Sequence, residues 1–179
     1  MPDRRTQLLD AALDVLSEKG MKGLTHRAVD AAAQLPEGTT SNYYRNRATL
    51  VQAVLGRLLE LDAALLQEQG PAGPPQDIEE LADQLATLML VLAGKHAGLT
   101  RARLAMSLDK PESVTAGHFR LVGGLEQALS ALGVPDAPAR ALDVADYGDG
   151  VLLHLLTVRR DRKPDAAAIA AAVRRLLAP

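Results

Sequence analysis

Two residue types that favour helices dominate this chain. Leu occurs 32 times and Ala 31 times, so together they fill 63 of the 179 positions. Residues that favour strands are scarce, since Ile occurs twice and the aromatic residues four times. Ala and Leu have high helix propensity, whereas sheets are enriched in β-branched and aromatic residues. The composition therefore predicts an all-α fold.

The remaining composition indicates a globular protein of the cytoplasm. Hydrophobic residues make up 47% and charged residues 23% of the chain, which suits one domain or two small ones. Cys is absent, which excludes disulfides and thiolate metal sites and fits a reducing compartment. The pattern contains neither a signal-peptide run nor an apolar stretch long enough for a bilayer. We therefore expect a cytoplasmic protein with no membrane partner.

Hydrophobic spacing predicts about nine helices. Apolar residues at i, i+3, i+4 and i+7 from Leu9 to Leu16 predict a first helix, which Gly20 ends. A second helix is expected after the capping residue Thr25 and a long fourth helix after the capping residue Asn46. The other expected helices cover residues 36–43, 77–94, 96–109, 112–132, 136–159 and 165–178, with a Gly- and Pro-rich loop at residues 70–75.

The first four predicted helices have the order of a helix-turn-helix unit. Two short helices joined by a tight turn follow a packing helix and precede a long one. The third helix, at residues 36–43, is rich in Thr, Ser and Asn, so it has low helix propensity and little to bury. Such side chains suit base edges and phosphates. Net charge gives little support, because the first fifty residues carry +1 and the rest −3.

These residues resemble the tetracycline-repressor (TetR/AcrR) family of bacterial regulators. The resemblance runs from about Arg5 to Leu58, roughly a third of the chain, and is carried by Ala11-Ala12, Gly20, Leu24-Thr25-His26-Arg27-Ala28-Val29, Gly38-Thr39, Tyr43-Tyr44-Arg45-Asn46-Arg47 and Leu50. The family usually has Ser where Pro36 stands and a hydrophobic residue followed by Tyr where Thr40-Ser41 stand. Because Ser41 replaces a bulky aromatic side chain, we expect an operator unlike those of better-known members.

The resemblance implies a DNA-binding domain at residues 1–46 and a ligand-binding and dimerisation domain at residues 47–179. It implies that Thr25 caps a helix at a phosphate, that Arg27 reaches a guanine edge and that Tyr43 binds a phosphate. The expected DNA-binding residues are Thr25, His26, Arg27, Glu37, Thr39, Ser41, Asn42, Tyr43 and Arg47. Taken singly, each has an alternative role as a cap, a half-buried ring or a solvated charge.

The last two predicted helices are candidates for a homodimer interface. A two-fold dimer would match a palindromic operator in double-stranded DNA, and the family dimerises through its final helices. The expected interface residues are Val144, Gly148, Val151, Leu152, Leu155, Ala168 and Ala172. Packing of these residues within one chain is the alternative.

The resemblance also implies a cavity for a small-molecule effector among the middle helices. The candidate lining residues are Leu85, Leu88, Met89, Leu92, Met106, His118, Phe119 and Val122. A plain hydrophobic core explains the same stripe of Leu and Met residues. The His residues show no metal-ligand spacing, and no cofactor motif occurs, so we expect neither a metal nor a cofactor.

Three functions fit these features. A ligand-responsive repressor that binds a palindromic operator as a homodimer is the leading interpretation, and activation depends only on where the operator lies. A helical small-molecule-binding protein with a vestigial DNA-binding unit is the second. An enzyme is the third, although the sequence contains no Gly-rich phosphate loop, no nucleophile elbow and no His-Glu-x-x-His motif.

Overall fold

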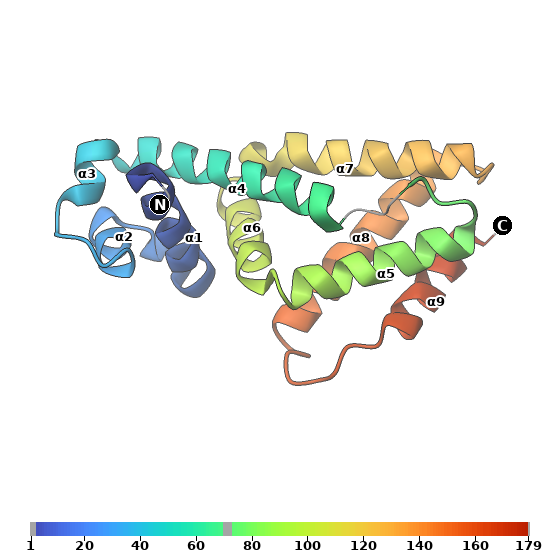
Figure 1. Ribbon diagram of the computed structural model, residues 1–179. Helices are drawn as coiled ribbons and strands as arrows, with labels where there is room; N and C mark the ends of the chain where they lie inside the picture. The colour runs from blue at the N-terminus through green and yellow to red at the C-terminus, as the bar shows by residue number, and fades with distance from the viewer. Residues whose placement is uncertain (1–2, 70–72, 179) are drawn as a thin grey trace. The chain divides into compact units, whose positions relative to one another are not determined.

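The computed structural model describes residues 3–69 and 73–178. Within these ranges the chain forms nine α-helices and no strand (Figure 1). They are α1 (Arg4–Gly23), α2 (His26–Ala32), α3 (Thr39–Tyr43), α4 (Arg47–Gln69), α5 (Ile78–Ala93), α6 (Ala97–Asp109), α7 (Pro111–Ala131), α8 (Ala137–Leu156) and α9 (Ala166–Leu177). In this described part of the chain, no helix is both long enough and apolar enough to span a membrane.

The predicted all-α fold is confirmed, and most helix ends lie within three residues of the expected positions. The third helix begins three residues later than predicted, at Thr39, and residues 37–38 form a turn instead. Residues 70–72 of the predicted loop lie outside the described residues, and residues 73–77 are not helical.

Side-chain caps start several helices as the sequence predicts. The Asn46 Oδ1 accepts a hydrogen bond from the Thr49 N–H at 2.9 Å, and the Thr49 hydroxyl accepts one from the Asn46 N–H. At the start of α5, Asp77 accepts from the Glu80 N–H at 2.8 Å, and the Glu80 carboxylate accepts from the Gln76 N–H. These contacts satisfy N–H groups that have no partner inside the helix.

Gly20 interrupts α1 where the sequence predicts its end. Its backbone has φ 64° and ψ −173°, although the helix assignment continues for one short turn to Gly23. This region of backbone space is open almost only to glycine, because a Cβ would clash with the chain. The residue therefore redirects the chain from α1 toward α2.

The helices group into two compact units. Unit 1 comprises Met1–Glu68 and Gly98–Val114, and unit 2 comprises Gln69–Ala97 and Thr115–Pro179. The compact unit that contains α1 to α3 also contains nearly all of α4 and α6, so it extends beyond the predicted DNA-binding domain of residues 1–46.

Unit 1 packs α1, α2, α4 and α6 around one apolar core. Its fully buried side chains include Leu8 and Leu16 of α1, Leu50 of α4 and Met106 of α6. Two ion pairs reinforce it. Arg57 contacts Asp10 at 2.8 Å and joins α4 to α1, while Arg103 forms a two-pronged pair with Asp62 that joins α6 to α4.

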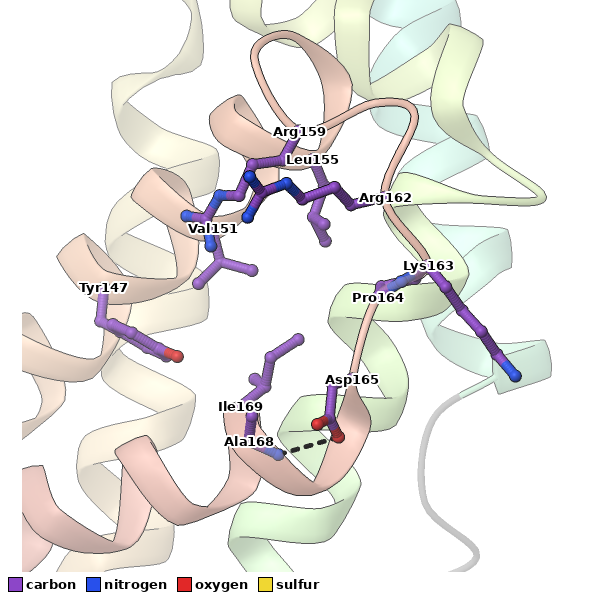
Figure 2. Close-up of a pocket in the computed structure, with 10 residues that line it drawn as sticks. All are labelled: Tyr147, Val151, Leu155, Arg159, Arg162, Lys163, Pro164, Asp165, Ala168 and Ile169. Atoms are coloured by element: carbon purple, nitrogen blue, oxygen red, sulfur yellow. Dashed lines mark hydrogen bonds between the residues drawn. The ribbon is translucent and has the colours of Figure 1, made fainter.

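Unit 2 packs α5 against α8 and α9. Its core contains Leu129 of α7, Val144 of α8 and Val173 of α9, all nearly inaccessible to solvent. Gly148 permits close approach of α8 to α5, because a Cβ there would lie 2.9 Å from the terminal methyl of Met89. A pocket of about 220 Å³ lies where α8, the segment after it and the start of α9 meet (Figure 2).

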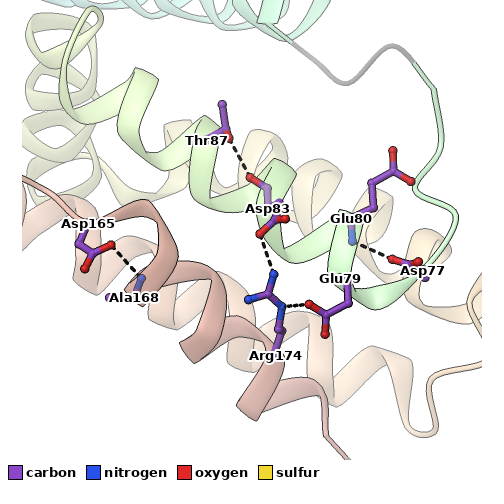
Figure 3. Close-up of polar contacts among 8 residues, drawn as sticks. All are labelled: Asp77, Glu79, Glu80, Asp83, Thr87, Asp165, Ala168 and Arg174. Atoms are coloured by element: carbon purple, nitrogen blue, oxygen red, sulfur yellow. Dashed lines mark hydrogen bonds and ion pairs between the residues drawn. The ribbon is translucent and has the colours of Figure 1, made fainter.

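Polar contacts hold the C-terminal part of α9 against its neighbours. The Arg174 guanidinium pairs with Glu79 and, at 2.7 Å, with Asp83, so it links α9 to α5 (Figure 3). Arg140 of α8 donates hydrogen bonds to the carbonyls of Leu176 and Ala178, which α9 leaves without partners at its C-terminus.

Candidate nucleic-acid interface

The interface starts at α2, whose first turn is capped by Thr25. The Thr25 hydroxyl accepts a hydrogen bond from the Ala28 N–H at 3.2 Å, and the Thr25 side chain is otherwise exposed. Leu24 and Val29 flank this cap and are completely buried in the unit 1 core. The predicted cap is therefore confirmed, and the hydroxyl lies at the surface.

The short helix α3 presents a polar surface. Ser41 and Asn42 are exposed, Thr39 is half-buried, and the Tyr43 side chain is 40% exposed. The hydroxyls of Thr39 and Ser41 donate hydrogen bonds to the carbonyls of Pro36 and Gly38, at 2.6 and 2.8 Å. Four of the predicted DNA-binding residues thus lie together on one five-residue helix, with hydroxyl, amide and phenol groups available for contact.

A buried carboxylate fixes the start of α3. Asp30 of α2 is 2% exposed, and its oxygens accept hydrogen bonds from the Gly38 N–H at 2.8 Å and the Thr40 N–H at 2.7 Å. The Thr40 hydroxyl, which is completely buried, donates a third hydrogen bond to the same carboxylate. A helix this short has almost no stability of its own, so this anchor determines where α3 lies on α2.

The hydrogen bonds also determine the charge state of Asp30. Burial alone raises the pKa of this carboxyl, but the hydrogen bonds from Thr40 and Gly38, together with the nearby His26, lower it below the ordinary value of 3.8. The lowered pKa means that Asp30 is ionised at neutral pH. An ionised carboxylate is the stronger acceptor for these donors.

Two predicted phosphate-binding residues are used within the unit to position α2 and α4. The His26 Nε2 lies 2.6 Å from the Tyr44 carbonyl oxygen and donates to it, so the start of α2 is tied to the end of α3. The Arg47 guanidinium donates a 2.6 Å hydrogen bond to the Met21 carbonyl, so the start of α4 is tied to the end of α1. Their contact with DNA stays a prediction.

Arg27 and Glu37 form an exposed ion pair across the turn. The Arg27 Nε lies 3.2 Å from the Glu37 carboxylate, and the two side chains are 86% and 71% exposed. Such exposed pairs contribute little to stability, so both side chains are free to exchange partners. The pair places the Glu37 carboxylate beside Arg27, which the family resemblance implies can contact the edge of a guanine base.

Tyr43 has a cationic neighbour from α1. The Arg5 guanidinium lies 6.0 Å from the centre of the Tyr43 ring, at the limit of a cation–π contact. The adjacent Tyr44 is buried in the unit 1 core, so one of the two consecutive tyrosines lies at the surface and the other in the core.

The sequence reading missed Asp30 and Thr40. Both lie at positions where helical periodicity alone gives no reason to expect a buried polar pair. The sequence did contain one indication, which is that a helix with so few apolar residues has to bury a polar one such as Thr40. A buried polar group requires a hydrogen-bond partner, and the nearest carboxylate in the preceding helix is Asp30.

Comparison with known proteins assigns this geometry to a family. Residues 8–54 match the family model for bacterial regulatory proteins of the tetR family, which covers α2, α3 and most of α1. The matched segment resembles the DNA-binding unit of tetR-family regulators. This match confirms the predicted resemblance and the prediction of a DNA-binding regulator. A comparison with curated proteins gave no match.

Solved TetR structures share the fold over the whole chain. A TetR-like transcriptional regulator from Rhodococcus sp. RHA1 is 22% identical with a TM-score of 0.77, and the alignment covers 99% of this chain and 96% of that chain. A TetR-family member from Streptomyces coelicolor A3 is 24% identical with a TM-score of 0.70, covering 99% and 100%. The multidrug binding protein EbrR, solved with malachite green, is 25% identical with a TM-score of 0.73, covering 99% and 100%.

The predicted effector-binding residues are divided between the two units. Met106 is completely buried in the unit 1 core, whereas the other seven belong to α5 and α7 of unit 2. Within unit 2, Met89 and Val122 are core residues, but Phe119 is 62% exposed and contacts the neighbouring His118 ring edge to face. None of the eight lines the 220 Å³ pocket. Their role in binding an effector stays a prediction.

The predicted dimer residues are mostly used inside the protomer. Val144, Gly148, Val151 and Leu152 are buried in unit 2. Leu155 and Ala172 are half-buried, and Ala168 is exposed. The helix α8 packs on α5, and Gly148 lies next to the Met89 side chain in this contact. Apolar residues on the exposed side of α8 are Leu142 and Leu153, each 45% exposed.

The described residues contain no group of three or more His, Cys, Asp or Glu side chains arranged to hold a metal ion. Asp143 and Asp146 of α8 are exposed, and Arg160 pairs with its neighbour Asp161 rather than with the α8 aspartates.

Proposed function

We propose that this protein is a ligand-responsive transcriptional repressor that binds a palindromic operator as a homodimer. The polar surface of α3, held in place by the buried carboxylate of Asp30, carries the proposal. Asn42 and Ser41 are exposed on this helix, and Arg27 lies beside it. Amide, hydroxyl and guanidinium groups are the side chains that read base edges in the major groove. DNA as the target also supports a cytoplasmic location.

The proposed dimer uses the exposed sides of α8 and α9. Leu142 and Leu153 are eleven residues apart, which is about three helical turns, so they share one face of α8. Ala168 adds a small exposed residue on α9, where another helix can approach closely. Two copies are needed because one three-helix unit reads few base pairs, and half-sites in DNA lie about one turn (~34 Å) apart.

A site for a small-molecule effector is supported by a structural relative. EbrR, a multidrug binding protein that is 25% identical to this chain, has been solved with malachite green and with ethidium. An effector would release the operator only if it bound the free and the DNA-bound arrangements with different affinity. Equal affinity for the two states would exclude the proposed regulation.

Helix α4 is the proposed link from the effector to α3, which we call the recognition helix because its polar surface is proposed to read the operator. Arg57 holds it to α1 through Asp10, and Arg103 holds it to α6 through Asp62. Two-pronged arginine–carboxylate pairs fix orientation as well as distance. A displacement of α4 would therefore be carried into α1, against which α2 packs.

The proposal is tested by the salt dependence of DNA binding. Purified protein is titrated onto fluorescent genomic DNA fragments between about 50 and 200 mM salt, where a dimer with six to ten phosphate contacts loses roughly 10³- to 10⁵-fold in affinity. Arg27→Ala should weaken binding. The control is Arg101→Ala, which removes an exposed arginine of α6 in the same unit. Salt-independent binding, or equal losses in both variants, would contradict the proposal.

A further inference from the structure

The pocket at the junction of α8 and α9 shares no residue with the predicted DNA-binding or effector-binding residues. It has a volume of about 220 Å³ and lies entirely within unit 2. Its walls come from the last turns of α8, the segment of residues 157–165 and the first turn of α9 (Figure 2). The pocket is thus built from consecutive parts of the chain.

The floor of the pocket is apolar. Tyr147, Val151 and Leu155 follow one another at intervals of four residues, so they line one face of α8. Ile169 of α9 closes the floor from the other side. Val151 and Ile169 are each 7% exposed, so the floor continues into the unit 2 core.

The rim of the pocket is cationic. Arg159, Arg162 and Lys163 all line it and lie within five consecutive positions. In Figure 2 the guanidinium groups of Arg159 and Arg162 lie near each other and near Val151, whereas the Lys163 side chain extends away from them. The two guanidinium groups repel one another unless an anion lies between them.

The two carboxylates closest in sequence to these cations have other partners. Asp161 pairs with Arg160, which does not line the pocket. Asp165 lines the pocket, but its carboxylate accepts a hydrogen bond from the Ala168 N–H at 3.1 Å and thereby caps α9. The Arg159 guanidinium donates a hydrogen bond to the His154 Nδ1 at 2.7 Å. An imidazole nitrogen that accepts a hydrogen bond carries no negative charge, so His154 does not neutralise Arg159.

We propose that this pocket binds a small organic carboxylate with an apolar body. The arginine fork of Arg162 matches a carboxylate geometrically, and Lys163 adds a flexible point charge. The hydrocarbon part would cover the floor formed by Val151, Leu155 and Ile169. The volume is below the ~300–1,000 Å³ of sites for drug-sized ligands, which selects a short aliphatic or aryl acid.

Binding of the acid stands independently of DNA binding, whereas its role as the effector rests on the proposed function. Val151, Leu155 and Ala168 belong both to the pocket and to the predicted dimer helices. A ligand seated there would contact the helices whose arrangement sets the spacing of the two recognition helices.

Hexanoate is the probe for the test. Hexanamide has the same apolar chain without the negative charge, and acetate has the charge without the apolar chain. Binding to the full chain is followed by two-dimensional ¹H–¹⁵N NMR at pH 7 without DNA. We expect hexanoate to shift the amide signals of residues 157–169 with a Kd of about 1 mM or lower, and the two comparison compounds to bind at least tenfold more weakly. Arg162→Gln combined with Lys163→Gln should weaken hexanoate binding at least tenfold.

The matched control is Arg160→Gln, which removes a cation from the same segment but not from the pocket. It should change the Kd for hexanoate less than twofold. Equal binding of hexanamide, equal losses in the control and the double variant, or no shift at about 10 mM hexanoate would each overturn the proposal. Absence of DNA binding with normal hexanoate binding would instead overturn the proposed function and leave the carboxylate site intact.

Discussion

The carboxylate of Asp30 accepts hydrogen bonds from both the backbone N–H and the hydroxyl of Thr40. Both residues are buried, and they join two helices that are separated by a tight turn. A helix of five polar residues would not form alone, because nucleation is unfavourable and it has little apolar surface to bury. The recognition surface therefore depends on a polar anchor rather than on hydrophobic packing.

Thr40→Val should destabilise the protein while preserving the shape of the side chain. The substitution removes one hydrogen bond to a charged group, which costs about 1.5–3 kcal/mol. Urea denaturation followed by circular dichroism measures the free energy of unfolding. Ser41→Ala is the control, because the exposed Ser41 hydroxyl contacts only the nearby Gly38 carbonyl, and we expect it to change stability by no more than about 0.5 kcal/mol. Equal effects would show that the anchor is unimportant.

The stability contributed by Asp30 should depend on pH. Its pKa in the folded protein is lowered, so the ionised carboxylate stabilises the fold above the ordinary pKa of 3.8, and this contribution is lost as pH falls through the lower folded value. The measurement is the difference in unfolding free energy between the natural protein and Asp30→Asn from pH 7 to 3. The difference should be constant from pH 7 to about 5 and shrink below about 4. A difference that grows toward acid would contradict the assigned shift.

The local parts of this fold could be predicted from the sequence because they depend on neighbouring residues. The caps at Thr25, Asn46 and Asp77 were predictable, since each accepts a hydrogen bond from an N–H three residues further along the chain. The Asp30 anchor joins residues ten positions apart across a turn, so no periodicity marks it. It also explains why α3 starts later than predicted, because the carboxylate binds the N–H groups of Gly38 and Thr40.

Contacts between distant helices account for the other differences. Arg47 looks like a phosphate ligand in the sequence, but its guanidinium binds the Met21 carbonyl, 26 residues away. Met106 has the apolar character expected of a cavity wall, yet it is buried in the unit 1 core. Side-chain type gives burial tendency, whereas the partner depends on how the helices pack.

Gly20→Ala should destabilise the protein because of its backbone conformation. At φ 64° and ψ −173°, a Cβ strains the chain even though no other atom lies within 4 Å of its position, and we expect a loss of roughly 1–3 kcal/mol. Gly56→Ala is the control, because we expect it to change the stability in the opposite direction. Gly56 lies in α4 with open space around it, so alanine should stabilise that helix by up to about 1 kcal/mol. Thermal unfolding of both variants gives the comparison, and stabilisation by Gly20→Ala would refute the assigned strain.

Glu37→Gln should strengthen binding to DNA of any sequence. The substitution removes a carboxylate that lies 3.2 Å from the Arg27 guanidinium. Arg27 would then be released to contact phosphates, and any repulsion between Glu37 and those phosphates would be removed. We expect several-fold tighter binding to non-specific duplex at about 100 mM salt. Glu18→Gln, an exposed acidic residue of α1, corrects for the change in net charge. Weaker non-specific binding by Glu37→Gln than by the natural protein would disprove this role of the ion pair.

The most direct test of the central claim is selection of binding sites from fragmented genomic DNA of the source organism. The natural protein is used without ligand at moderate salt, beside a double variant, Asn42→Ala and Tyr43→Ala, that alters the exposed face of α3 and leaves the Asp30 anchor intact. We predict that the natural protein enriches a short inverted repeat with half-sites about one DNA turn apart (~34 Å), and that the folded double variant does not. Enrichment of the same repeat by both proteins, or no enrichment by a folded natural dimer, would contradict the assignment of α3 as the element that reads DNA.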